Sequence, residues 1–200
     1  MSFFDVFQLT MMGLFLLVFG GRTAIMSIRG TRVIVLGTGK SGFGAVLEVV
    51  FLAGLCAWCW EVVAQSLGHE ARLLPETLYV PVIEHPALSI AGAVMIGAGF
   101  IVFIWALVSF GASWRVGIDT RRPGDLITHG AFSISRNPIF LFIDLYFVGT
   151  ALIYGNPFFL TCALATVTGI HFQIKQEEKF LSKQYGGAYA EYLLRTRRYL

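Results

Sequence analysis

Charged residues are scarce in this chain of 200 residues. Asp, Glu, Lys and Arg make up 14% of the sequence and hydrophobic residues 56%, whereas an average soluble domain has roughly 25% charged and 45–50% apolar residues. The formal net charge of +3 is also small, so the composition indicates no nucleic-acid partner. A chain this apolar is expected to lie in a lipid bilayer, where its basic residues report orientation.

Cysteine and histidine are few and poorly placed for metal chemistry. The three Cys residues all lie in apolar runs, and Cys56 and Cys59 form a CxxC pair within LCAWCW, where thiols usually behave as small apolar side chains. The four His residues are scattered without metal-ligand spacing. Residues 37–44 read GTGKSGFG but lack the residue order of a P-loop. No metal site is therefore predicted.

Long apolar runs dominate what is present. Spanning the hydrocarbon core takes about 20 residues, and five runs reach or approach that length: residues 3–20, 45–67, 87–110, 139–153 and 158–174. The last two are separated by a Gly-Asn-Pro turn, and Pro is well suited to the first position of a helix. The runs predict an all-α polytopic membrane protein of about five transmembrane helices, of which the last two form a tight hairpin.

The chain after Ile174 predicts a helical C-terminal tail. The helical pattern continues to Gln184, where Gly186 and Gly187 mark a stop. Residues 188–197 are then expected to form one more short helix. The whole chain, residues 1–200, is expected to be a single membrane-embedded domain.

Basic residues alternate between the two sides of this map. Four Lys or Arg residues lie between the first and second runs, one between the second and third, four between the third and fourth, none in the hairpin turn and six in the tail. Because cytoplasmic loops carry an excess of Lys and Arg, the N-terminus is expected outside and the C-terminus in the cytoplasm.

The hairpin should bring two groups of polar residues together at the cytoplasmic surface. Arg136, Asn137 and Pro138 stand at the start of the fourth run, and Glu177 and Glu178 stand just past the end of the fifth. An antiparallel hairpin places these two ends side by side. Taken singly, the residues also fit an interfacial anchor and a solvated helix face.

Two linked motifs indicate a family. Residues 126–140 read LITHGAFSISRNPIF, and residues 177–200 read EEKFLSKQYGGAYAEYLLRTRRYL. This arrangement resembles the isoprenylcysteine carboxyl methyltransferase and phospholipid methyltransferase superfamily, with its pattern LxxxGxYxxxRHPxY, a hydrophobic hairpin, EE and then YGxxYxxYxxxxxR. The resemblance implies an integral membrane methyltransferase that uses S-adenosylmethionine and acts on a hydrophobic, lipid-like or prenylated acceptor. Its cofactor-binding part would span about residues 111–200.

The resemblance also implies roles for individual residues. It assigns cofactor binding to Leu126, Gly130, Phe132, Arg136, Asn137, Pro138, Phe140, Glu177 and Glu178. His129, which lies beside Gly130 in the same motif, is a further candidate for cofactor contact. It assigns catalytic roles to Arg136, Asn137 and Arg198. Asn137 replaces a His and Phe140 replaces a Tyr of the family pattern, which puts a proton-transfer role at both positions in doubt.

Four further residues are candidates for substrate binding. Tyr189 and Tyr192 match the family's tail. Asp144 is an acid within an apolar run, a place where ionisable residues are costly and often functional; it either lines a substrate cavity or bonds structurally to another helix. Trp114 opens the preceding loop and is a candidate for the substrate entrance or for an interfacial anchor.

The sequence also leaves two other functions open. A membrane reductase of the sterol reductase type, using NADPH, has a similar tail, but the LxxxGxF, RNP and EE set fits the methyltransferases better. A non-enzymatic membrane scaffold would explain the composition but leaves the linked motifs unexplained. Besides the bilayer, the expected partner is the hydrophobic or prenylated substrate.

Overall fold

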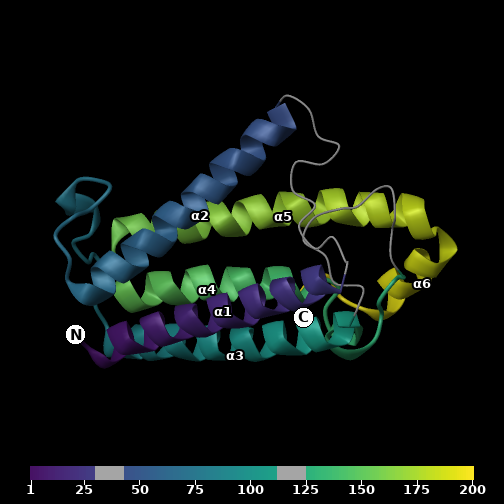
Figure 1. Cartoon of the computed structure of the whole chain (residues 1–200), viewed down its shortest axis with the longest axis horizontal. Helices are drawn as coiled ribbons and strands as arrows, with labels where there is room; N and C mark the ends of the chain where they lie inside the picture. Colours follow the sequence, from purple (N-terminus) through teal and green to yellow (C-terminus); the bar gives the residue numbers. More distant parts are fainter. Residues whose placement is uncertain (30–42, 112–124) are drawn as a thin grey trace. The chain divides into compact units, whose positions relative to one another are not determined.

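In the computed structural model, residues 1–29, 43–111 and 125–200 are described, without the side chains of residues 43–48 (Figure 1). The described residues divide into two compact units, one formed by residues up to Val80 and the other by residues from Pro81 onward. Whether the whole chain acts as one functional domain therefore stays a prediction.

The first unit contains two long helices that contact each other, α1 (Phe3–Ile28) and α2 (Phe43–Leu67), and the short 3-10 helix η1 (Glu76–Leu78). The segment after α2 is held by Glu61, whose side chain is fully buried. Glu61 accepts a hydrogen bond of 2.7 Å from the backbone N–H of Leu73 and pairs with Arg72 at 3.4 Å. These contacts satisfy a carboxylate that would otherwise be costly to bury.

The second unit is built on three long helices, α3 (Pro86–Phe110), α4 (Pro138–Tyr154) and α5 (Pro157–Tyr185). α4 contacts both α3 and α5, and Figure 1 shows the helices running side by side. The 3-10 helix η3 (Gly130–Ser133) precedes α4, and α6 (Gly187–Arg195) follows α5. All three long helices begin with Pro, which needs no N–H partner at that position.

Small residues allow α3 and α4 to approach closely. A Cβ added to Gly149 would lie 2.6 Å from the carbonyl oxygen of Gly92, and a Cβ at Gly92 would collide with the carbonyl oxygen of Gly149. Close backbone approach through glycine is a common way of packing helices in membranes.

Three consecutive residues, Gly155, Asn156 and Pro157, form the turn between α4 and α5. Gly155 adopts a left-handed conformation with φ of 60°, and its carbonyl accepts hydrogen bonds from the N–H groups of Val82 and Ile83. Asn156 caps α5 by accepting a 3.0 Å hydrogen bond from the N–H of Phe159. Pro157 then begins the helix. The predicted tight hairpin is confirmed.

Within the described part of the chain, four helices are long and apolar enough to cross a membrane: α1, α2 from Val49, α3 and α5. The apolar helix α4 has 17 residues and completes the five predicted runs. The described residues form no named strand, so the all-α prediction is confirmed. α1 extends beyond its predicted end to Ile28, and the predicted short tail helix is α6.

Candidate active site at the polar end of the helical hairpin

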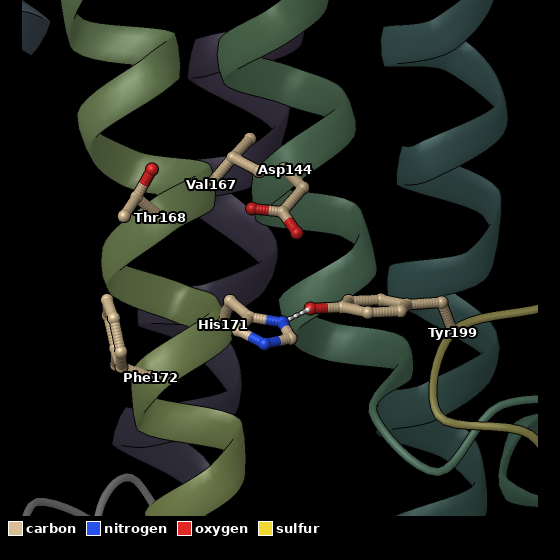
Figure 2. Close-up of a pocket in the computed structure, with 6 residues that line it drawn as sticks. All are labelled: Asp144, Val167, Thr168, His171, Phe172 and Tyr199. Atoms are coloured by element: carbon tan, nitrogen blue, oxygen red, sulfur yellow. Dashed lines mark hydrogen bonds between the residues drawn. The ribbon is translucent and has the colours of Figure 1, made fainter.

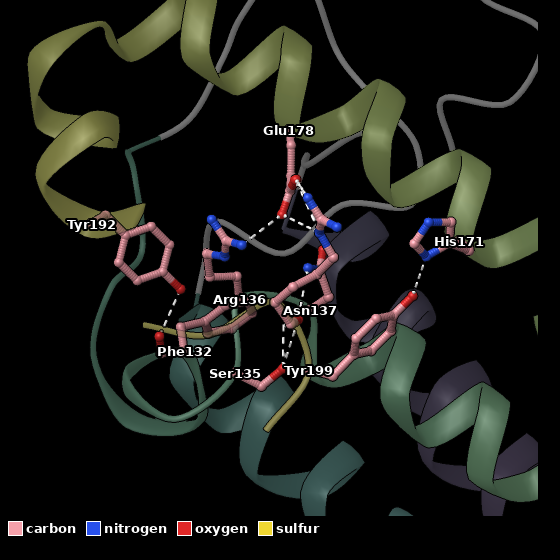
Figure 3. Close-up of polar contacts among 9 residues, drawn as sticks. Phe132, Ser135, Arg136, Asn137, His171, Glu178, Tyr192 and Tyr199 are labelled. Atoms are coloured by element: carbon pink, nitrogen blue, oxygen red, sulfur yellow. Dashed lines mark hydrogen bonds and ion pairs between the residues drawn. The ribbon is translucent and has the colours of Figure 1, made fainter. Parts of the chain in front are cut away.

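An ionic cluster forms where the start of α4 meets the charged end of α5. Arg136, two residues before α4, places Nη2 3.2 Å from Oε1 of Glu178 (Figure 3). Arg198, beyond α6, donates from Nε to Oε1 at 3.1 Å and from Nη2 to Oε2 at 2.7 Å. Both oxygens of Glu178 therefore receive charge-assisted hydrogen bonds, and the predicted meeting of Arg136 with the glutamate pair is confirmed for Glu178.

The cluster is largely shielded from water. The Arg136 and Glu178 side chains are 11% and 13% exposed, while that of Arg198 is 36% exposed. Hydrogen bonding to Glu178 raises the pKa of Arg198 above its usual value. The Nε atom of Arg136 is buried and has no hydrogen-bond partner in the described part of the chain. A buried donor without a partner is costly, so this atom is suited to receive an acceptor oxygen.

Backbone contacts fix the tail against the loop before α4. Ser135 and Arg197 form a parallel bridge, in which the N–H of Arg136 donates to the carbonyl of Arg197 at 2.9 Å. The buried Asn137 donates from Nδ2 to the carbonyl of Arg198 at 3.0 Å. Asn137 does not use its side chain to cap α4. The residue that replaces the family's His therefore holds the tail in place.

An apolar cluster supports this loop from the other side. It consists of buried residues of α3, η3 and α6: Ala106, Ala131, Phe132, Tyr189 and Tyr192. The hydroxyl of Tyr192 donates a 2.6 Å hydrogen bond to the carbonyl of Phe132. Burial raises the pKa of Tyr189 to about 12 and also raises that of Tyr192. Both phenols thus stay neutral at physiological pH and fasten α6 to the loop.

Gly130 is required for the path of the loop. It has φ of 61°, and a Cβ at this position would collide with the Ser109 hydroxyl of α3. That hydroxyl accepts a 3.0 Å hydrogen bond from the N–H of Ala131. The close approach of η3 to the end of α3 therefore depends on glycine.

A cavity of about 510 Å³ has Tyr199, the residue after Arg198 of the ionic cluster, in its lining. It is lined by Asp144 of α4, by four residues of α5 and by Tyr199 of the tail. Nδ1 of His171, on α5, lies 2.9 Å from the hydroxyl oxygen of Tyr199, and the two rings stack. Figure 2 shows the Asp144 carboxylate in the space between α4 and α5. The pKa of Tyr199 is raised, mainly by burial and to a smaller extent by the negative charge of Asp144.

Residues 88–188, which include most of this site, match the phospholipid methyltransferase family. The chain belongs to the phospholipid methyltransferase family. It is a multi-pass membrane protein, with several helices long and apolar enough to cross a membrane. It is also a methyltransferase, as the names of the matched family and relatives state.

Curated relatives agree with this assignment. The chain is 30% identical over 135 residues to probable protein-S-isoprenylcysteine O-methyltransferases of Oryza sativa subspecies indica and japonica, covering 66% of this chain and 70% of each relative. It is 31% identical over 113 residues to protein-S-isoprenylcysteine O-methyltransferase A of Arabidopsis thaliana, covering 54% of this chain and 57% of that protein. No solved structure matches the chain.

The remaining residues predicted from the family pattern differ in exposure. Pro138 is buried at the first position of α4, while Leu126, Phe140 and Glu177 are half-buried and His129 is exposed. Glu177 makes no hydrogen bond or ion pair within the described residues. Trp114 lies outside the described residues.

The structure adds two residues to the neighbourhood that the sequence did not assign, His171 and Tyr199. His171 precedes Glu178 by about two helical turns, so both lie on one face of α5. Tyr199 directly follows Arg198. The seven-residue spacing from Glu178 could have identified His171 as a neighbour of the site. The position of Tyr199 could not have been found in this way, because the return of the tail to α5 depends on long-range contacts. Among residues 1–29, 43–111 and 125–200, no three His, Cys, Asp or Glu residues gather as metal ligands.

Proposed function

We propose that this methyltransferase transfers a methyl group from S-adenosylmethionine to a hydrophobic acceptor, either lipid-like or prenylated. The family match names phospholipid methyltransferases and the relatives are named for protein-S-isoprenylcysteine, so both acceptor types stay within the proposal. The observation that carries it is the cluster of Arg136, Glu178 and Arg198 at the polar end of the α4–α5 hairpin.

The polar groups of this cluster fit the charges of the cofactor. S-adenosylmethionine carries a carboxylate, an ammonium and a sulfonium. Arg136, with its unpartnered Nε, is the proposed receptor for the carboxylate. Because both oxygens of Glu178 are taken by arginines, Glu177 is the proposed partner for the ammonium or the ribose hydroxyls. Glu178 then acts by orienting Arg136.

Phe132 and Phe140 have different proposed roles, the first in packing and the second in cofactor binding. Phe132 is 8% exposed and packs in the apolar cluster, edge-on against Phe110 at 4.6 Å between ring centroids. Phe140 is half-buried in the first turn of α4. Phe140 is therefore the better candidate for a cation–π contact with the sulfonium, worth about 0.5–2 kcal/mol. Leu126, His129 and Gly130 would complete the walls of the cofactor site.

Catalysis in such a site rests on positioning and on exclusion of water. When bound, S-adenosylmethionine supplies an electrophilic methyl group with a good leaving group. Arg136, Asn137 and Arg198 hold the loop and the tail in one arrangement, which reduces the entropy cost of aligning the acceptor. Asp144 and the cavity beside it are the proposed acceptor site. Tyr189 and Tyr192, which pack in the apolar cluster, and Trp114 stay candidates for substrate binding.

The proposal extends to the placement of the chain in the membrane. The N-terminus lies outside and the tail in the cytoplasm, as the distribution of basic residues indicates. The polar cofactor then arrives from the cytoplasm and the acceptor from the bilayer. Residues 1–200 act as one membrane-embedded unit, with the cofactor part at about residues 111–200.

The experiment that tests this function is transfer of a labelled methyl group in vesicles containing the purified chain. Phospholipid and prenylcysteine acceptors are supplied separately with labelled S-adenosylmethionine. Transfer to at least one of them is expected. Glu177→Gln should weaken cofactor binding and transfer, whereas Glu191→Gln, the same change at an exposed position of α6, should leave both intact. No transfer to any acceptor, or equal effects of the two variants, would contradict the proposal.

A further inference from the structure

The segment that follows α2 folds back along that helix. Glu61 precedes the end of α2 by six residues, about 9 Å along the helix axis. The backbone N–H of Leu73 nevertheless donates to Oε1 of Glu61 at 2.7 Å, and Arg72 pairs with Oε2 at 3.4 Å. Residues 72–73 therefore lie beside the last two turns of a helix that is apolar enough to cross a membrane (Figure 1).

The charged groups of this segment face the helix. The Arg72 side chain is 16% exposed and that of Glu61 is fully buried. The Arg72 guanidinium also lies over the ring of the buried Tyr79, 4.9 Å from the ring centroid. A buried ion pair is stable only when further hydrogen bonds offset its desolvation. The N–H of Leu73 supplies such a bond, and the carboxylate in turn satisfies a backbone donor.

The apolar side chains of the same segment face outward. Leu73, Leu74 and Val80 are 55%, 45% and 56% exposed. In water, leucines outside an ion pair are unfavourable, because the apolar surface stays hydrated while the charges lose their hydration. In lipid the same arrangement is favourable, because polar groups must be satisfied internally and the outer surface must be apolar.

Two features indicate the depth at which this segment lies. Trp60 precedes Glu61, is 45% exposed and packs edge-on against the ring of His69. Tryptophan is enriched where headgroups meet acyl chains. The exposed acids Glu70 and Glu76 lie on the same segment and require water or headgroups. The segment therefore fits the boundary between headgroups and acyl chains, rather than the centre of the bilayer.

We propose that residues 72–80 form a lipid-facing loop whose partner is the acyl chains of the leaflet at this end of α2, and that the Glu61–Arg72 pair holds the loop at that depth. The loop precedes residues 88–188, which carry the family match. The inference depends neither on the acceptor nor on the cofactor.

Charge and continuity favour acyl chains over other partners. Arg72 is the only basic residue among residues 68–85, and its guanidinium binds Glu61. The loop thus offers no cation to an acidic protein or to anionic headgroups. Its apolar surface follows directly on α2, whose last residue, Leu67, is 58% exposed. The bilayer that surrounds α2 is therefore the partner closest to Leu73 and Leu74.

The test measures which medium surrounds single positions of the loop. The three free cysteines are replaced by alanine, and Leu74→Cys or Glu76→Cys in the full chain is labelled with a nitroxide in nanodiscs. Collisions with oxygen, which concentrates in acyl chains, are compared with collisions with a water-soluble nickel chelate. The ratio of oxygen to nickel collisions should be severalfold higher for the label at Leu74 than for the label at Glu76.

Charge variants test whether the ion pair holds the loop in place. Glu61→Gln or Arg72→Gln alone leaves an uncompensated charge at this depth, so the collision ratio at Leu74 should fall to the value found at Glu76. The double variant removes both charges, and the amide introduced at Glu61 can still accept the N–H of Leu73, so the ratio should recover. Glu70→Gln, at an exposed position of the same segment, is the control and should change nothing.

Three results would overturn the inference. Equal collision ratios at the two labelled positions would place the loop in water. A label at Leu74 that neither oxygen nor nickel reaches would show that protein covers the loop, either a second copy or another part of the chain. Equal ratios in the single and double charge variants would mean that the ion pair lies at a water surface, where such pairs contribute little. If a single variant does not fold, the two labelled positions and the double variant still decide.

Discussion

Arg198 binds both carboxylate oxygens of Glu178, at 3.1 Å from Nε and 2.7 Å from Nη2. The two residues come from opposite sides of the bend between α5 and α6. Glu178 also pairs with Arg136 at the start of α4. One carboxylate on α5 therefore links the hairpin, the loop before α4 and the C-terminal tail.

Loss of the Arg198–Glu178 pair should weaken the attachment of the C-terminal tail to α5. Arg198→Ala removes the hydrogen bonds that Nε and Nη2 donate to Glu178, and charge-assisted bonds of this kind contribute about 1.5–3 kcal/mol when they are well shielded. Because the Arg198 side chain is 36% exposed, we expect the loss of unfolding free energy to lie at or below the lower end of that range. Thermal unfolding in detergent should show a lower midpoint, and the affinity for S-adenosylmethionine should fall.

Arg197→Ala is the matched control for that variant. The Arg197 side chain is exposed, and only its backbone carbonyl takes part in the bridge with the loop. It should behave like the unmodified chain. If both variants had the same unfolding midpoint and cofactor affinity, the Arg198–Glu178 pair would have no role in the site.

The hairpin turn should not tolerate a side chain at Gly155. Gly155→Ala combines a left-handed backbone, costing on the order of 1–2 kcal/mol, with a collision against the carbonyl of Ile83. Gly169→Ala in α5 has open space for its Cβ and should be neutral or slightly stabilising. Unfolding midpoints of the two variants measure the difference, and equal midpoints would contradict the described turn.

Tyr192 offers a way to separate packing from substrate binding. Tyr192→Phe leaves the buried carbonyl of Phe132 without its 2.6 Å hydrogen bond, which should cost about 1–3 kcal/mol of stability. If Tyr192 acts only by fastening α6, KM for the acceptor should stay unchanged in the folded fraction. A raised KM with unchanged stability would support the substrate contact expected from the family's tail.

Much of the fold followed from local sequence signals. Gly155, Asn156 and Pro157 predicted the hairpin because each residue suits one position of the turn. The register of that hairpin then predicted the meeting of Arg136 with Glu178. Gly186 and Gly187 likewise predicted the end of α5 and a further short helix, which is α6.

Long-range contacts account for what the sequence did not predict. After α6 the tail turns back, so that Tyr199 reaches His171 and the carbonyl of Arg198 reaches Asn137. No local pattern specifies these partners, because they depend on how α6 packs against η3. The packing of Tyr189 in the apolar cluster is of the same kind. The substrate roles of Asp144 and the tyrosines stay predictions.

Membrane orientation is a separate prediction. A reporter fused after Leu200 should be active on the cytoplasmic side, because the tail and the two longer loops hold most of the basic residues. A second reporter at the N-terminus should be active only outside. The reverse pattern would place the ionic cluster on the outer surface, away from a cytoplasmic supply of cofactor.

The measurement that tests the central claim most directly is calorimetric titration of the purified, unmodified chain with three ligands. S-adenosylmethionine and its demethylated product, S-adenosylhomocysteine, should each bind at a single site, and NADPH should give no binding heat. The combination follows from the proposed role of Arg136 and Glu177 as partners of the cofactor's carboxylate and ammonium. Binding of NADPH without binding of S-adenosylmethionine would contradict the account and favour a membrane reductase.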